Sequence, residues 1–252
     1  MEKKPDRWKC NACGAEGATS REHLFHIAIG RVIVADKGLT PDQVRTRLQD
    51  AYHRDFRLYK LGGSPIADEE EGAAWFNQAI EGLICMGCNK RWAKELEEQA
   101  GENLYDFTNL HGRADARLLR RWAFFFATKL WWGHRRTEPL AGGLLLPFLG
   151  KLVDPAVRID MPVRLARLTS SPRDWSFAGI MRGWAGTKSP YIMWIMRGVV
   201  WMVVAKSPHQ ISLPVRTTEL VDGLTLPQVP AIRRRELVPL FKAPPWPPGS
   251  RD

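Results

Sequence analysis

The pattern of apolar residues follows helical spacing over roughly the first 150 residues and changes to alternation farther along the chain. A helix over 41–57 begins with a threonine N-cap followed by a proline, and another begins at the acidic run 68–71. The segment 89–100 directly follows the last cysteine, and 115–132 places leucines and aromatic residues on one helical face. These segments predict a largely helical first part of the protein.

From about residue 154 the chain becomes rich in proline, tryptophan and β-branched residues, a composition typical of strands and their connections. Strands are expected over 157–168, 175–184, 191–196 and 199–205. The last two flank Arg197-Gly198, which predicts a tight turn between two buried strands. The apolar stretch 191–205 is too short and too interrupted to cross a bilayer, so we expect no membrane partner.

Charge is distributed unevenly along the 252 residues, whose formal net charge is +10. Residues 1–100 hold 15 basic and 16 acidic side chains, whereas residues 101–252 hold 22 and 11. The basic excess therefore lies in the later part of the chain. Such an excess predicts a polyanionic partner, and a solvated basic surface is the alternative.

All four cysteines fall in two Cys-x-x-Cys pairs, Cys10/Cys13 and Cys85/Cys88. Two such pairs complete a tetrahedral shell, so the sequence predicts a structural zinc ion. The 71 residues between the pairs exceed the usual spacing, but the cost of closing a loop grows only with the logarithm of its length. Disulfides, buried thiols and a redox pair are the alternatives. The charged start of the chain resembles no signal peptide and indicates a cytoplasmic protein, where disulfides are disfavoured.

Two further motifs accompany the cysteines. Ser-x-Glu-His, with Glu22 and His23, follows the first pair, and Cys-x-x-Cys-Asn-x-x-Trp, with Asn89 and Trp92, contains the second. This order resembles the HNH endonucleases, which have a ββα-metal fold with a zinc-knuckle frame. The resemblance extends over roughly residues 8–135.

The resemblance implies an α+β protein in which a zinc-framed ββα-metal (HNH) core is joined to a helical extension and a β-rich C-terminal region. On this interpretation the core with a helical insertion occupies residues 1–100, and the helical extension 101–153. A basic, Trp-rich region follows over 154–242, and residues 243–252 form a Pro-rich tail, expected to be extended or disordered.

The resemblance also implies a role for each matching residue. Glu22 and Asn89 would bind a catalytic divalent ion, Mg²⁺ or Mn²⁺. His23 would be the general base that takes a proton from the attacking water, and Asn77 would orient that base. A proline usually stands three residues after the catalytic histidine in this family; here His26 stands there and could add a ligand.

These residue types suit phosphodiester hydrolysis. A neutral imidazole can accept the proton of a water near pH 7, and an oxygen-ligated divalent ion can stabilise the charge that develops on the phosphate. In the basic later region, the arginines expected to contact nucleic acid are Arg120, Arg121, Arg135 and Arg136.

Three functions stay open at this point. The first is a metal-dependent endonuclease that cuts DNA, for which the resemblance suggests a role in prokaryotic or phage defence. The second is a zinc-stabilised protein that binds nucleic acid without cutting it. The third is an interaction or sensor module, in which the Trp-rich region 154–242 recognises a protein partner.

Overall fold

The computed structural model describes residues 8–55, 79–108, 112–133, 142–169, 177–185, 189–204, 215–233 and 236. The helix expected to begin at 68–71 and the tail 243–252 lie outside these ranges. The described residues form a mixed α+β structure, which confirms the α+β part of the expected fold class.

A two-stranded sheet that leads into a long helix carries the residues of the expected site. Its elements are β1 (Thr19–His23), β2 (Ala79–Cys85), α4 (Met86–Cys88), η1 (Asn89–Ala93) and α5 (Lys94–Thr108). The strands are antiparallel, with Glu22 opposite Ile80. Gly82 has a φ of +77°, which favours glycine, and the register shifts beside it as in a β-bulge. This arrangement is compatible with the ββα core that the resemblance implies.

One helix packs against α5 and a second packs against that helix, and both contacts need glycine. They are α1 (Ile27–Val34) and α2 (Pro41–Asp55). A Cβ atom on Gly101 of α5 would lie 2.7 Å from the Cβ of Ala28, so glycine is required for α1 to approach α5 this closely. The predicted start of α2 is confirmed: the Gln43 amide donates to the Thr40 hydroxyl, and the Thr40 amide donates to the Gln43 side chain.

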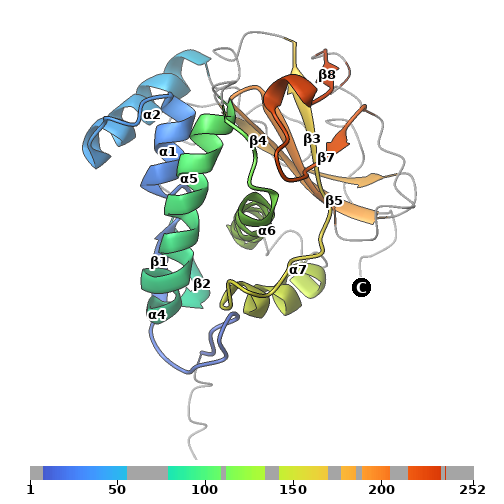
Figure 1. Ribbon diagram of the computed structural model, residues 1–252. Coiled ribbons are helices and arrows are strands. Elements are labelled where there is room, and N and C mark those ends of the chain that lie inside the picture. Colours follow the sequence, from blue (N-terminus) through green and yellow to red (C-terminus); the bar gives the residue numbers. More distant parts are fainter. Residues whose placement is uncertain are drawn as a thin grey trace, which may run out of the picture.

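The helix α6 (Ala116–Gly133) lies at the centre of the molecule, between the layer of α1 and α5 and the larger sheet (Figure 1). Every residue from Arg121 to Trp131 is buried. Trp122 stacks on Phe126 with ring centroids 5.3 Å apart, and its edge-to-face contacts reach the larger sheet. Two short helices follow α6, α7 (Gly142–Leu149) and η3 (Gly150–Leu152).

The larger sheet has six strands in the order β4-β5-β6-β3-β7, with β8 beside β3. They are β3 (Val163–Leu168), β4 (Phe177–Ala185), β5 (Ser189–Met196), β6 (Val199–Val204), β7 (Thr218–Glu219) and β8 (Ala231–Ile232). Arg197 and Gly198 both have positive φ, 52° and 70°, as the predicted tight turn requires. β3 begins at Val163, later than the expected start at residue 157. Pro162, directly before it, has no N–H group to donate to a strand ladder.

One hydrophobic core runs through all three regions that the sequence suggested. Cys10 beside the small sheet, Trp122 in α6 and Trp201 in β6 belong to the same buried cluster. The helical extension therefore packs against the small sheet as well as against the larger one. Among the residues that the structure describes, no helix combines the length and the apolar character needed to cross a membrane.

Candidate functional site

The four cysteines meet in one cluster, as the sequence predicts. Their sulfur atoms all lie within 4.8 Å of one another, with Cys10 and Cys88 3.9 Å apart and Cys13 and Cys85 3.8 Å apart. Zinc–sulfur bonds of about 2.3 Å in a tetrahedron place sulfur atoms about 3.8 Å apart. Sulfur atoms in a disulfide are about 2.05 Å apart, so no pair here is bonded. The cluster can therefore hold a metal ion such as zinc.

Backbone amides point at these sulfur atoms. The Cys85 amide donates to the Cys10 sulfur at 3.2 Å, and the Cys88 amide donates to the Cys85 sulfur at 3.4 Å. Burial alone would raise the pKa of Cys10, but amide donors that include those of Cys13 and Cys85 lower it to about 7. Burial raises the pKa of Cys88. A metal cation would compensate the charge of thiolates placed this close together.

The segment around Cys10 and Cys13 is attached to β2 by polar contacts. The indole of Trp8 donates to the carbonyl of Gly82. The side-chain amide of Asn11 donates to the carbonyl of Leu83 at 2.8 Å. The Ser20 hydroxyl in β1 donates to the carbonyl of Ile84. The cluster thus fixes the start of α4 against the two strands.

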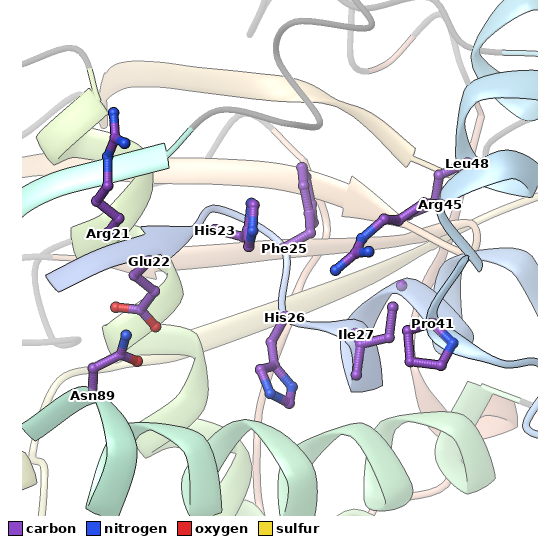
Figure 2. A pocket seen from close by; sticks show the side chains of 11 residues that line it. Arg21, Glu22, His23, Phe25, His26, Ile27, Pro41, Arg45, Leu48 and Asn89 are labelled. Atoms are coloured by element: carbon purple, nitrogen blue, oxygen red, sulfur yellow. The ribbon is translucent and has the colours of Figure 1, made fainter. Parts of the chain in front are cut away.

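A cavity of about 310 Å³ opens beside the small sheet. It brings together three of the predicted site residues, Glu22, His23 and Asn89 (Figure 2). It is lined by Arg21, Glu22, His23, Phe25, His26, Ile27, Gly30, Pro41, Arg45, Leu48 and Asn89. The fourth predicted residue of the site, Asn77, lies outside the described residues.

Glu22 is the buried anion of this cavity, with a side chain 5% exposed. Its Oε1 accepts a hydrogen bond from the Lys129 ammonium at 3.2 Å. Its Oε2 has no hydrogen-bond partner among the described residues. A buried carboxylate oxygen without a partner is costly, and a water molecule or a cation can satisfy it.

Asn89 supplies a side-chain amide on the same side of the cavity as that carboxylate. Figure 2 shows its side chain extending from the start of the helix after β2 toward Glu22. Carboxylate and amide oxygens are the ligands that Mg²⁺ and Mn²⁺ prefer. The residues present therefore fit a divalent ion held by Glu22 and Asn89.

His23 occupies the end of β1, and its side chain is exposed. Successive residues of a strand point to opposite faces, and Figure 2 shows the His23 ring and the Glu22 carboxylate on opposite sides of β1. Both nevertheless line the same cavity, because the strand ends there. The ring is thus accessible to solvent and to a bound substrate.

His26 caps the first turn of α1, a role that the sequence did not reveal. Its Nδ1 accepts a hydrogen bond from the amide of Ala28 at 3.3 Å, so the neutral ring carries its proton on Nε2. Burial lowers the pKa of His26 to about 4, and the charges of Lys129, Lys94 and Arg31 act in the same direction. His26 is therefore neutral at pH 7, and its Nδ1 is occupied by the helix cap.

The arginines expected to bind nucleic acid are placed differently from that expectation. Arg121 is 7% exposed, and its guanidinium donates to the carbonyls of Leu152, Asp154 and Val157. These contacts engage the guanidinium with protein carbonyls, so Arg121 fixes the segment after η3, and its contact with nucleic acid stays a prediction. Arg120 donates to Glu219 and to the carbonyl of Leu220, and its side chain is 15% exposed. Arg135 and Arg136 lie outside the described residues.

Two other arginines line the cavity itself. Figure 2 shows Arg21 and Arg45 on either side of His23. Arg21 pairs with Glu81 and Arg45 with Asp42, both at exposed positions. Exposed ion pairs are weak, so these guanidinium groups can exchange their partners for a phosphate at little cost.

The sequence did not reveal the buried group that Glu22 forms with Lys129 and Glu97. Lys129 of α6 contacts Glu97 of α5 at 2.8 Å as well as Glu22, and the Lys129 side chain is fully buried. Burial and the neighbouring carboxylate of Glu22 raise the pKa of Glu97 to about 8, against the opposing effect of Lys129. Burial alone would lower the pKa of Lys129, but Glu22 and Glu97 outweigh this and raise it. One feature of the sequence could have indicated this group: Lys129 lies on the apolar face of the predicted helix 115–132.

Comparisons of this chain with known protein families, with curated proteins and with solved structures find no match.

We predict that the purified protein contains about one equivalent of zinc per chain, held by the four cysteines. Cys85→Ser should release the zinc and unfold the small sheet, because the cluster joins its two strands. Metal analysis and circular dichroism check this, with Met86→Ala, at a neighbouring exposed position, as the control. A cooperatively folded protein with less than about half an equivalent of zinc would contradict the assignment.

We also predict that His26 makes the protein less stable in acid. The ordinary pKa of histidine is 6.5 and that of His26 is about 4, so below pH 6.5 the unfolded chain takes up a proton that the folded protein does not. The free energy of unfolding should therefore fall between pH 6.5 and 4. Asparagine also caps helices but does not titrate there, so His26→Asn should show a shallower fall in melting temperature over this range. Equal slopes for both proteins would refute it.

Proposed function

We propose that this protein is a metal-dependent endonuclease of the HNH type that hydrolyses phosphodiester bonds of DNA. The observation that supports this most is the unpaired Oε2 of buried Glu22, in a cavity that also holds His23 and Asn89. The cysteine cluster next to this cavity supports the same proposal, because it could supply the zinc frame.

Each of these residues has a separate task in the proposed reaction. Glu22 and Asn89 hold a Mg²⁺ or Mn²⁺ ion, which would stabilise negative charge on the phosphate and on the leaving oxygen. His23 accepts a proton from a water molecule as that water attacks phosphorus and the bond to the leaving oxygen breaks. The exposure of His23 suits this task, because the water and the phosphate approach from solvent.

The DNA backbone would reach the cavity between Arg21 and Arg45. Their guanidinium groups lie at its rim, whereas Arg120 and Arg121 are bound to protein carbonyls. In the proposed complex, exposed arginines beside the catalytic histidine bind phosphates and fix the position of the scissile bond.

The interaction module receives less support than the nuclease. Trp194 and Trp201, the tryptophans of region 154–242 whose side chains the structure describes, are fully buried and stack on each other. These two belong to the core, so they offer no surface to a protein partner. The biological setting that we propose for this nuclease activity is prokaryotic or phage defence.

We predict that His23→Ala lowers cleavage by roughly 100- to 10,000-fold, the usual contribution of a general base. Zinc content and DNA affinity should be unchanged, because the side chain is exposed and acts mainly in the transition state. Plasmid DNA, single-stranded DNA and RNA are incubated with Mg²⁺, Mn²⁺ or EDTA, and cleavage is followed on gels. His26→Asn, in the same cavity, is the matched histidine control.

The outcomes separate the open functions. Cleavage that needs a divalent ion and His23 supports the proposal. Binding of DNA without cleavage under any metal would favour the inactive binding protein, and full activity in His23→Ala would refute the assignment of the base.

We further predict that Arg21→Gln and Arg45→Gln each weaken DNA binding and lower the slope of log affinity against log salt by about one. Arg158→Gln is the control, since Arg158 is an exposed arginine outside the cavity, paired with Asp160. It should leave both affinity and slope nearly unchanged. An equal effect of all three variants would mean that binding is spread over the basic surface and does not centre on this cavity.

A further inference from the structure

We propose that Lys129 is a positioning residue for the divalent-ion site: it holds Glu22 by Oε1 and thereby leaves Oε2 for the cation. This inference rests on the proposed function and extends it. It makes α6, which lies far from the motifs in sequence, a part of the catalytic site.

The contacts of Lys129 give it no other evident task. Its ammonium is fully buried and contacts Glu22 at 3.2 Å and Glu97 at 2.8 Å. It is closed to solvent, so it cannot bind a phosphate of the substrate. The ammonium therefore acts through the carboxylates it holds.

The hydrogen bonds of Glu22 are asymmetric in a way that a purely structural ion pair would not require. A carboxylate buried only for stability gains most when both of its oxygens are paired. Here Lys129 binds Oε1, and Oε2 has no hydrogen-bond partner among the described residues. The unpaired oxygen belongs to the residue that lines the cavity beside Asn89.

The side chain of Lys129 is held in place by its surroundings. Lys129 lies in the buried part of α6, where the neighbouring Thr128 hydroxyl donates to the carbonyl of Phe124 and the ring of Phe125 lies 5.2 Å from the ammonium. Glu97 holds the ammonium from the opposite helix, α5. A side chain fixed by core packing and by two carboxylates can keep Glu22 in one rotamer, which is what a metal ligand needs.

A pair of variants separates positioning from charge. Because the pKa of Glu97 is about 8, its carboxyl is mostly protonated at pH 7. At that pH, Lys129→Met/Glu97→Met therefore removes one positive charge from beside Glu22 together with the tether. Glu97→Gln leaves the formal charge nearly unchanged and keeps the contact between Lys129 and Glu22. Mn²⁺ binding to the full-length, zinc-loaded protein is measured by electron paramagnetic resonance, without DNA, together with zinc content and melting temperature.

If Lys129 positions Glu22, the double variant should bind Mn²⁺ about 10- to 100-fold more weakly, the usual effect of losing such a supporting contact. Glu97→Gln should then stay within about threefold of the wild type, because the tether is intact. If charge alone matters, the double variant, which has lost a positive charge beside the cation, should bind Mn²⁺ more tightly than the wild type. Tighter or unchanged binding by the double variant would overturn the proposal.

Two further controls keep the result interpretable. Lys37→Met removes an exposed lysine that pairs with Asp106, and it should leave Mn²⁺ binding unchanged. If the double variant loses zinc or cooperative unfolding, Lys129→Gln/Glu97→Gln, which keeps polar side chains of similar length, replaces it: a tenfold loss of affinity, about 1.4 kcal/mol, supports the tether and near-wild-type affinity overturns it. Glu22→Ala tests the site itself. If wild type and Glu22→Ala bind Mn²⁺ equally, the proposed function and the role of Lys129 both fail.

Discussion

The cysteine cluster is the constraint on which the candidate site depends. It joins two chain segments separated by 71 residues and places both at one end of a two-stranded sheet. Without this link, nothing in the local sequence would hold Glu22 at the end of one strand beside Asn89 at the start of the following helix. Amide donors to the sulfur atoms and the contacts of Asn11 with β2 strengthen the link. The geometry can accommodate a zinc ion, which would supply most of its strength.

The second organising element is α6, because it connects the site to the rest of the core. On one side its aromatic residues pack against the tryptophans of the larger sheet, and on the other Lys129 contacts Glu22. A buried ion pair contributes little net stability, because desolvation offsets most of the attraction. Its position beside the cavity is therefore better explained by the site than by folding. On this account the helical extension is part of the proposed nuclease, not an appendage to it.

The sequence predicted the parts of the structure that depend on local rules. The capped start of α2, the tight turn at Arg197-Gly198 and the cysteine cluster each follow from residues close together or from one ligand chemistry. The sequence did not predict the features that depend on contacts between residues far apart in the chain. A basic count cannot show that Arg121 is bound to buried carbonyls, and a lone lysine on an apolar helix face cannot name Glu22 as its partner. Likewise, His26 matched a motif position, but its cap on α1 depends on the backbone.

The central claim is that a divalent ion binds between Glu22 and Asn89, separate from the cysteine cluster. Anomalous diffraction from crystals soaked in Mn²⁺ tests it most directly, since scattering at the zinc and manganese absorption edges distinguishes the two metals. We expect a zinc peak among the four sulfur atoms and a separate manganese peak next to the Glu22 carboxylate and the Asn89 amide. A crystal with zinc in its place and the cavity accessible, but with manganese bound elsewhere or not at all, would contradict the account.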